Sequence, residues 1–353
     1  MEQQFAHGRA LTAGIAYTPH YAHINRLYYD TGEVQGPYVD GLDHDFLGRR
    51  GVLSAYTTWL QPVGNWTTLW GLRVENEKLY IRSDGTTVER SDGTVYPSLN
   101  VMHGVSENAK MKLSYSRRVD PPGIFSYDPG YWTSTSELRY SGNPDLKSPK
   151  TDSLEVQYVY ALKDINFESS IFSRTTHDFL TRRSFVASDG VIVIQPVNEG
   201  QSRSSGGEIT LKASASPKLK YSLNLTLLRN EIPMYAGSIR DYVTMNGNLL
   251  LEYERGARGK LKGDVYQLKL NYTGRSYNPQ GYTAAYHALN LTWQHPITPK
   301  LTLVMDGIDV TNGATSVQVV DTPALRYRTR QTAFGPYLRV GLAYKFAGNQ
   351  EAH

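Results

Sequence analysis

Apolar and polar residues alternate along most of this chain. The pattern is clearest near the end, where Arg339, Gly341 and Lys345 lie on one face of the segment 337–346 and five apolar side chains lie on the other: Leu338, Val340, Leu342, Tyr344 and Phe346. A period of two predicts a β-strand with one apolar face. The segment also has about the length that a tilted strand needs to cross a bilayer, roughly 9–11 residues.

The same alternation recurs from the start of the chain and predicts an all-β protein. Two further clean examples are 154–162 and 219–227, each with five apolar positions in phase. Altogether the pattern predicts fourteen strands, at residues 8–18, 50–60, 66–80, 96–105, 110–119, 151–162, 165–180, 203–215, 218–229, 242–254, 260–273, 282–294, 300–311 and 328–346.

The connections between these strands alternate strictly in length. The short ones are 61–65, 106–109, 163–164, 216–217, 255–259 and 297–300, and the long polar ones are 19–49, 81–95, 120–150, 181–202, 230–241, 274–281 and 312–327. Outer-membrane barrels have short turns on one side and long loops on the other, whereas a soluble sandwich does not sort its loops in this way. The pattern predicts a transmembrane antiparallel up-and-down β-barrel. Asp84-Gly85 and Asp92-Gly93 are expected to be turn dipeptides within the loop 81–95.

Composition agrees with a barrel without requiring one. The chain has 353 residues, 26 tyrosines, 5 tryptophans, no cysteine and a mean hydropathy of −0.45, so a soluble β-rich binding protein stays open as an alternative. Tyr and Trp suit strands and the aromatic girdles of membrane barrels. The net charge is only +4 and no run of Lys or Arg stands out, so no nucleic-acid partner is expected. The first residues show no signal peptide, which an exported protein needs.

One segment carries a family resemblance. Residues 142–158 read GNPDLKSPKTDSLEVQY, and the residues that match in kind are Gly142, Asn143, Pro144, Leu146, Lys147, Pro149, Ser153, Glu155 and Tyr158. This segment resembles a motif in the barrels of TonB-dependent outer-membrane receptors and the related outer-membrane β-barrel family. TTLWGLRVEN at 67–76 is similar to a recurrent strand of the family, and 338–346 is similar to its closing strand. In the motif, Ser148 and Lys150 depart from the family pattern.

The resemblance implies a receptor that imports a bulky, scarce nutrient such as a ferric siderophore, a vitamin or an oligosaccharide. Family members have a plug, a segment gripped by TonB and 22 strands, so this chain is expected to be the C-terminal part of such a barrel. The implied partners are outer-membrane lipid, the barrel-assembly machinery, a small-molecule ligand and, if a plug lies upstream, the TonB complex. The implied location is the outer membrane of a Gram-negative bacterium.

The candidate chemistry is ligand binding rather than catalysis. Aromatic and arginine side chains crowd the loop 120–150 and suit siderophore, sugar or peptide recognition: Tyr127, Tyr131, Trp132, Arg139 and Tyr140. The GNPDLK motif is expected to be a stiff structural turn, because Asn-Pro and Ser-Pro disfavour helix. Three arginines, Arg73, Arg117 and Arg339, are expected to face the lumen and to pair with carboxylates.

Enzymatic and metal-binding alternatives rest on few residues. The chain contains no HExxH and no GxSxG motif. His177 and Asp178 lie where a catalyst at the barrel rim would lie, and His20 and His23 form an incomplete metal-ligand pair. The sequence therefore predicts a barrel at 1–346 with a tail at 347–353, no enzyme activity and no cofactor. A passive pore, a structural barrel and a non-functional receptor fragment are the alternatives.

Overall fold

The computed structural model describes residues 2–26, 44–135, 137–235, 237–256, 263–332 and 335–346, with Arg26 and residues 131–135 described by their backbone alone. The predicted tail 347–353 lies outside the described residues. Within those ranges the two helices, η1 (Ala6–Gly8) and η2 (Ile124–Tyr127), are short 3₁₀ segments. No helix in the described ranges is long and apolar enough to cross a membrane.

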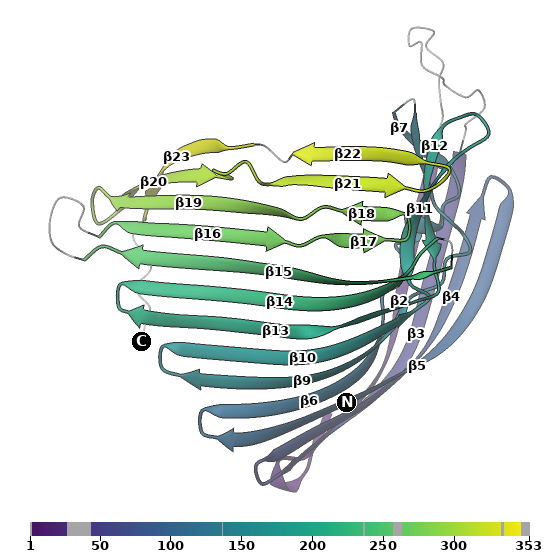
Figure 1. Cartoon of the computed structure of the whole chain (residues 1–353). Helices are drawn as coiled ribbons and strands as arrows, with labels where there is room; N and C mark the ends of the chain where they lie inside the picture. The colour runs from purple at the N-terminus through teal and green to yellow at the C-terminus, as the bar shows by residue number, and fades with distance from the viewer. Residues whose placement is uncertain are drawn as a thin grey trace.

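Long antiparallel strands form one sheet, and its order follows the order of the chain (Figure 1). The fifteen strands are β1 (Glu2–Gln4), β2 (Ala10–Arg26), β3 (His44–Val63), β4 (Trp66–Ser83), β5 (Thr86–Ser106), β6 (Ala109–Val119), β9 (Lys150–Leu162), β10 (Ile165–His177), β13 (Gln201–Ser216), β14 (Leu219–Pro233), β15 (Ile239–Glu254), β16 (Val265–Thr273), β19 (Tyr286–Pro296), β20 (Leu301–Ile308) and β23 (Tyr337–Tyr344). Apart from the three-residue β1, each of these strands overlaps one of the fourteen predicted strands. The all-β, up-and-down barrel architecture is confirmed.

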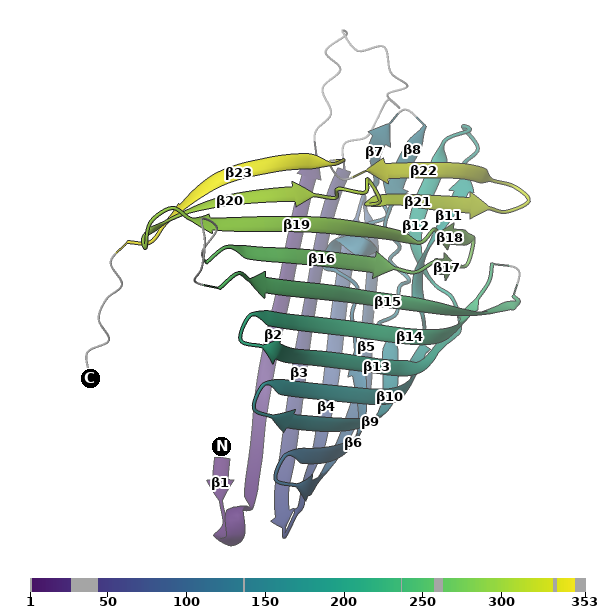
Figure 2. The ribbon, with the colours of Figure 1, turned by 60° about the vertical axis from the view of Figure 1, so that its left-hand side comes forward.

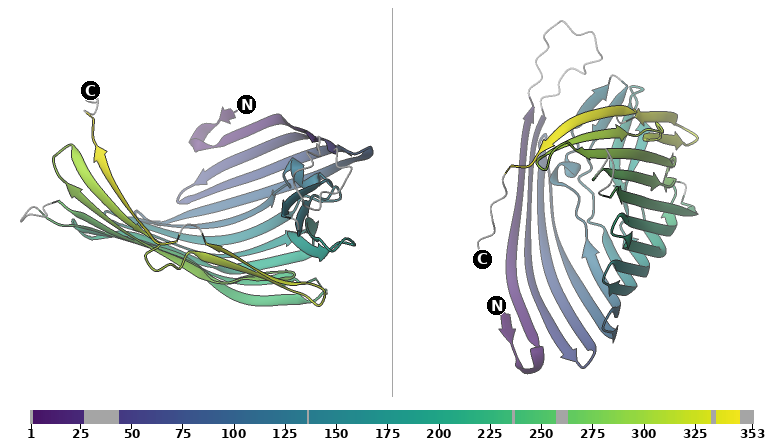
Figure 3. Two further views of the ribbon diagram at one scale, coloured as in Figure 1. Left: turned by 90° about the horizontal axis from the view of Figure 1, so that it is seen from above. Right: turned by 90° about the vertical axis from the view of Figure 1, so that its left-hand side faces the viewer.

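The sheet curls around a central space without closing on itself. Figures 2 and 3 show β2 to β5 facing the wall of β14 to β23 across this space, which we call the lumen. The sheet order begins at β1 and ends at β23, so the first and last strands do not pair in the described residues. A backbone edge in lipid needs a hydrogen-bonding partner, and the edge strands of the described sheet are β1 and β23.

Short turns lie at one end of the sheet, which we call the turn end, and long loops lie at the other, the loop end. At the turn end β9 passes to β10 through Lys163 and Asp164, with Lys163 at φ 43°, and Gly64 turns β3 into β4 at φ 57°. The predicted turn 255–259 runs into residues that are not described. The predicted sorting of connections by length holds for these turns, with one exception at the loop end.

One predicted loop is instead a hairpin. The segment 81–95 continues β4 and β5, which stay paired up to a two-residue turn at Asp84-Gly85, with φ of 47° and 81°. Positive φ at both positions suits the tight turn of a twisted hairpin. The second dipeptide, Asp92-Gly93, is not a turn: it lies inside β5, opposite Glu77 and Asn76. The polar sequence of this stretch predicted a loop. In the structure Val88 packs inward with Leu79 and Ile81, and this burial keeps the two strands paired up to the turn.

The outward face of the sheet is apolar. On β23 the side chains of Leu338, Val340 and Leu342 are 64%, 58% and 66% exposed, and Tyr344 follows them in phase. Neighbouring strands expose further large apolar residues on this face, among them Ile15, Leu53, Trp70, Leu72, Val74, Leu154 and Val156. An outward apolar surface with an opposite polar face is the pattern of a strand sheet that lies in lipid.

Two of the three predicted lumen arginines face inward and pair there. Arg73 bonds Glu75 at 2.5 Å, and both Nε and Nη2 of Arg339 donate to Asp306, at 2.9 and 2.8 Å. The third prediction was wrong: Arg117 shares its face with Leu113, which is an exposed apolar residue, so it points outward. There it makes two hydrogen bonds to Asp152, at 2.9 and 2.8 Å.

The long loops form two small sheets of their own. The first, which we call the 131–198 loop sheet, contains β7 (Tyr131–Thr135), β8 (Leu138–Ser141), β11 (Leu180–Val186) and β12 (Ile192–Asn198), and in it β8 and β12 run parallel. The second, the 276–332 loop sheet, contains β17 (Ser276–Asn278), β18 (Gly281–Thr283), β21 (Thr315–Asp321) and β22 (Arg326–Thr332). The predicted last strand, 328–346, is thus two strands, β22 and β23, in different sheets.

Candidate functional site

The segment 120–149 folds back onto the lumen face of β2 to β5. Its anchors are Tyr127 and Leu146, both fully buried, in a cluster with Ala22, Phe46, Leu79 and Ile81 from the sheet. Burying a side chain of this kind contributes roughly 1.5–3 kcal/mol. The hydroxyl of Tyr127 accepts a hydrogen bond from Arg90 at 3.3 Å, and burial raises the pKa of Tyr127. The long loop is therefore a fixed part of the lumen wall.

The GNPDLK motif holds this segment in place through its backbone. The amide of Gly142 donates to the carbonyl of Asp128 at 2.7 Å, and the amide of Asn143 donates to that of Ser126 at 2.8 Å. A Cβ at Gly142 would lie 2.4 Å from the Asp128 oxygen, which explains the glycine. The side-chain amide of Asn198 accepts a hydrogen bond from the backbone N–H of Lys147 and donates one to the carbonyl of Lys147.

The other motif positions have structural surroundings as well. The carbonyl of Pro149 accepts a hydrogen bond from Asp120 at 3.2 Å, where the segment meets the ends of β6 and β9. Pro144 lines a cavity of about 220 Å³ against the β4–β5 hairpin. On β9, Glu155 lies 3.9 Å from Arg174, and the rings of Tyr158 and Phe167 are 6.4 Å apart.

The five side chains expected to bind a ligand have different environments. Tyr127 has no exposed surface and packs the loop. Arg139 is ion-paired with Asp189 at 2.6 Å. Tyr140 lines a cavity of about 330 Å³ between the segment 120–149 and the strands β11 and β12. For Tyr131 and Trp132 the side chains lie outside the described residues. Of the five, Tyr140 is the one that we find lining a described cavity.

Side-chain hydrogen bonds at Ser184 join the two loop sheets. Gln280, at the turn between β17 and β18, is buried and bonds the backbone of Ser184 on β11 twice: its oxygen accepts from the amide at 2.5 Å and its nitrogen donates to the carbonyl at 2.7 Å. The Ser184 hydroxyl also lies 3.3 Å from the hydroxyl of Tyr327 on β22. A side-chain amide thus takes the place of a strand at the edge of β11.

Replacing Gln280 by Leu is expected to separate the two loop sheets. The substitution leaves the amide and carbonyl of Ser184 without partners, and a buried unsatisfied polar group costs about 1–3 kcal/mol. Hydrogen exchange of residues 180–186 and 276–283 is expected to rise in this variant, while exchange in β9 and β10 stays unchanged. Unaltered exchange in both loop segments would show that Gln280 does not join them.

A cluster of arginine and tyrosine side chains at the loop end was missed by sequence reasoning. Arg240 lies 4.7 Å from the ring centre of Tyr277, and Arg275 lies 4.8 Å from that of Tyr282. The rings of Tyr242 and Tyr277 are 4.8 Å apart. The hydrogen bond from Arg275 lowers the pKa of Tyr277. Tyr242 shares its strand face with Asn246, which lines the lumen-side pocket on β14 to β16.

Strand pairing places two more arginines on the same sheet face as Tyr282. Tyr282 lies opposite Val319, and Val319 lies opposite Arg328, so these side chains share one face of the 276–332 loop sheet with Arg330. Among the described carboxylates, none lies within ion-pair distance of Arg328 or Arg330. We call the set the Arg-Tyr cluster; it comprises Arg240, Tyr242, Arg275, Tyr277, Tyr282, Arg328 and Arg330. The alternating sequence RYRTR at 326–330 was the available signal, since it puts three arginines on one strand face.

The histidine alternatives find little support in the geometry. His20 and His23 lie three residues apart on β2 and so point to opposite faces of the sheet, and His23 bonds Asp45 at 2.9 Å. His177, at the end of β10, lies 3.7 Å from Asp152, which already accepts hydrogen bonds from Arg117 and Tyr115. In the described part of the chain no three metal-ligating groups come together.

Comparison with known proteins agrees with the architecture. Solved structures of similar fold include the ferric yersiniabactin uptake receptor FyuA from Yersinia pestis (TM-score 0.67, 14% identity, 96% of this chain and 51% of that one). They also include the ferric-catecholate import receptor Fiu from E. coli K12 (TM-score 0.65, 13% identity, 96% and 52%) and the siderophore receptor PiuA from Acinetobacter baumannii (TM-score 0.63, 16% identity, 96% and 52%). The chain thus spans about half the length of these structures.

Sequence comparison identifies the family directly. No curated protein sequence is significantly similar to this chain. The match to the outer membrane protein beta-barrel family, in contrast, runs over residues 1–344, nearly the whole chain. The chain therefore belongs to the outer membrane protein beta-barrel family.

Proposed function

We propose that this chain forms the wall and the ligand-catching loops of an outer-membrane import receptor. Its substrate would be a bulky, scarce nutrient, of which an anionic metal chelate fits the structure better than a vitamin or an oligosaccharide. The observation that carries the proposal is the Arg-Tyr cluster at the loop end of the sheet, where Arg240 and Arg275 lie 4.7 and 4.8 Å from the ring centres of Tyr277 and Tyr282. A catalytic role has no comparable support.

The chemistry of the cluster favours an anion with flat aromatic groups. A guanidinium group recognises carboxylate and phenolate oxygens through charge-assisted hydrogen bonds, and tyrosine rings stack on aromatic ligands. Receptors of similar fold are named for ferric yersiniabactin, ferric catecholates and siderophores. The cavity lined by Tyr140 and Arg182 would be a second contact for such a ligand.

Transport through this receptor would need a source of energy. A tightly bound ligand can leave the receptor for the cell interior only if the lumen is opened. The outer membrane has no energy source of its own that could drive this opening. We propose coupling to the TonB complex through a plug in the lumen, insertion by the barrel-assembly machinery, and location in the outer membrane of a Gram-negative bacterium. A barrel over residues 1–346 followed by a short tail is the corresponding domain division.

Replacing Arg328 and Arg330 together by Ala is expected to weaken binding of an anionic chelate by roughly a hundredfold or more. Two charge-assisted contacts would be lost, and each contributes about 1.5 kcal/mol or more. The probe is a trianionic ferric tris-catecholate, measured by fluorescence quenching of the full chain in detergent. Thr329→Ala, on the other face of the same strand, is the matched control.

The same measurement separates the alternatives. A neutral oligosaccharide that binds, while the chelate does not, would replace the proposed substrate class. If neither binds and the protein gives a steady open conductance in a planar bilayer, the chain is a passive pore. Equal chelate affinity in the double variant and in Thr329→Ala would remove the Arg-Tyr cluster from the site.

A further inference from the structure

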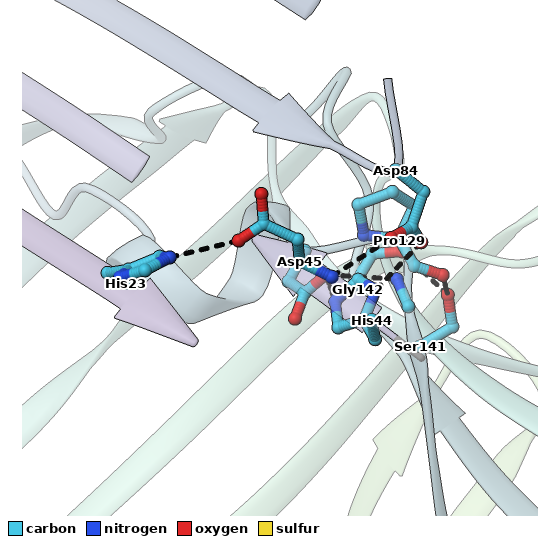
Figure 4. A network of polar contacts seen from close by, with 9 residues as sticks. His23, His44, Asp45, Asp84, Pro129, Ser141 and Gly142 are labelled. Atoms are coloured by element: carbon cyan, nitrogen blue, oxygen red, sulfur yellow. Dashed lines mark hydrogen bonds and ion pairs between the residues drawn. The ribbon is translucent and has the colours of Figure 1, made fainter. Parts of the chain in front are cut away.

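A buried histidine joins the segment 120–149 to the sheet. His44 is the first residue of β3, and its side chain is 6% exposed. Its Nδ1 lies 2.7 Å from a carboxylate oxygen of Asp84 in the β4–β5 turn, and its Nε2 lies 2.6 Å from a carboxylate oxygen of Asp128, just after η2 (Figure 4). Three segments far apart in the chain therefore meet at one imidazole ring.

With both carboxylates ionised, both contacts are hydrogen bonds only when the imidazole of His44 is protonated. An ionised carboxylate only accepts, and a neutral imidazole has a single N–H, whereas the imidazolium donates from both nitrogens. Asp128 is 1% exposed, and its Oδ1 also accepts a hydrogen bond from the amide of Gly130 at 3.0 Å. Its Oδ2 has no hydrogen-bond partner in the described structure. A buried carboxylate in this position needs a nearby positive charge, which a protonated His44 supplies.

Besides Asp128, the charged group in contact with His44 is Asp84. Asp84 accepts a hydrogen bond from the amide of Asp45, and the side chain of Asp45 turns away to His23 and Arg82. Burial acts to raise the pKa of Asp84, but the hydrogen bonds from Asp45 and His44 outweigh it and hold that pKa below its usual 3.8. Asp84 therefore stays ionised down to acidic pH.

The contact with Asp128 reaches the cavity at Tyr140 through the backbone. The carbonyl of Asp128 accepts from Gly142, and the hydroxyl of Ser141 donates to the carbonyl of Pro129 at 3.0 Å. Gly130 packs against the imidazole so closely that a Cβ would lie 2.3 Å from a ring atom. Ser141 and Gly142 line the cavity that also holds Tyr140. A change at His44 would therefore move a wall of that cavity.

We propose that His44 is a proton-dependent latch that holds the segment 120–149 against the sheet. With a protonated ring, both carboxylates are bound and the segment is docked. When the ring loses its proton, one N–H disappears, one carboxylate faces a nitrogen lone pair, and the docked state is weakened. The latch rests on the geometry alone; its effect on ligand capture rests in addition on the proposed function.

The test measures docking directly, without a ligand. The sequence contains no cysteine, so engineered cysteines at Thr86 and Phe125, both exposed, can carry a nitroxide pair in the full chain. The distance distribution is measured by pulsed electron paramagnetic resonance from about pH 5 to about pH 9, the range in which histidine changes charge. The variants are His44→Gln, which does not titrate, and His23→Gln, which removes an exposed His-Asp pair as the control.

The expected result is a pH-dependent docked population. In the unsubstituted chain the undocked fraction should rise roughly tenfold between the acidic and the alkaline limit, as expected for the loss of one charge-assisted hydrogen bond. His44→Gln should be independent of pH, and His23→Gln should titrate like the unsubstituted chain. A distance distribution that does not change with pH, or one that titrates equally in His44→Gln, would overturn the latch. Chelate binding, measured separately, decides the proposed function.

Discussion

Replacing Val340 by Arg is expected to prevent stable insertion of this sheet into a membrane. Val340 lies in the middle of β23 on the outward face, where its side chain is 58% exposed between Leu338 and Leu342. A charged residue on the lipid face of a barrel strand costs about 2–4 kcal/mol near the bilayer midplane. The measurement is the midpoint of denaturant unfolding in lipid vesicles, together with the yield of membrane-inserted protein.

The neighbouring position provides the control. Gly341 lies on the lumen face of the same strand, opposite Val304, and a Cβ there would meet no atom within 4 Å. Gly341→Arg adds the same side chain one residue away and is expected to insert normally, because its guanidinium reaches the polar lumen. Equal loss of insertion in both variants would contradict the assignment of the outward face to lipid.

Replacing Gly142 by Ala is expected to undock the segment 120–149. The new Cβ would lie 2.4 Å from the Asp128 carbonyl oxygen and 2.6 Å from that of Ser126, so these two hydrogen-bonded backbones must separate. Overpacking and the lost hydrogen bonds together cost about 2–4 kcal/mol. Amide exchange of residues 124–146 should become roughly 30-fold to 1,000-fold faster, since 1.4 kcal/mol corresponds to a factor of ten.

A second glycine in the same segment provides the comparison. At Gly123 a Cβ would come no closer than 3.9 Å, to the hydroxyl of Ser126, and φ is −57°, which any residue adopts. Gly123→Ala is expected to leave the exchange of residues 124–146 unchanged. If both variants exchange alike, the GNPDLK motif does not hold the segment through close backbone contact.

The strands could be predicted because their signal is local. Lipid on one side and a polar lumen on the other impose a period of two on every strand, and the length of each connection shows at which end of the sheet it lies. The same rule already places Arg117 with Tyr115 and Leu113 on the outward face. The expectation that it faces the lumen followed its charge instead of its position in the alternation.

The loop end could not be predicted because its contacts are distant in sequence. β8 pairs in parallel with β12, at Leu138 opposite Ile192, and Gln280 bonds Ser184. Burial changed a further interpretation. Tyr127 is fully buried and anchors the segment 120–149, although its residue type suggested contact with a ligand. The GNPDLK motif was interpreted as structural, since its prolines restrict the backbone wherever they occur, but its partners in and next to η2 were not visible in the sequence.

The pairing of β8 with β12 has a consequence for how the loops of barrels of this family diversify. The connection 120–149 supplies β8, and the connection 178–200 supplies β11 and β12, so neither has a complete sheet without the other. Exchanging one of these connections alone between related barrels would break the Asn143–Pro196 and Asn198–Lys147 bonds. Recombination or engineered grafting should therefore succeed when both segments are transferred together, as one inherited unit of specificity.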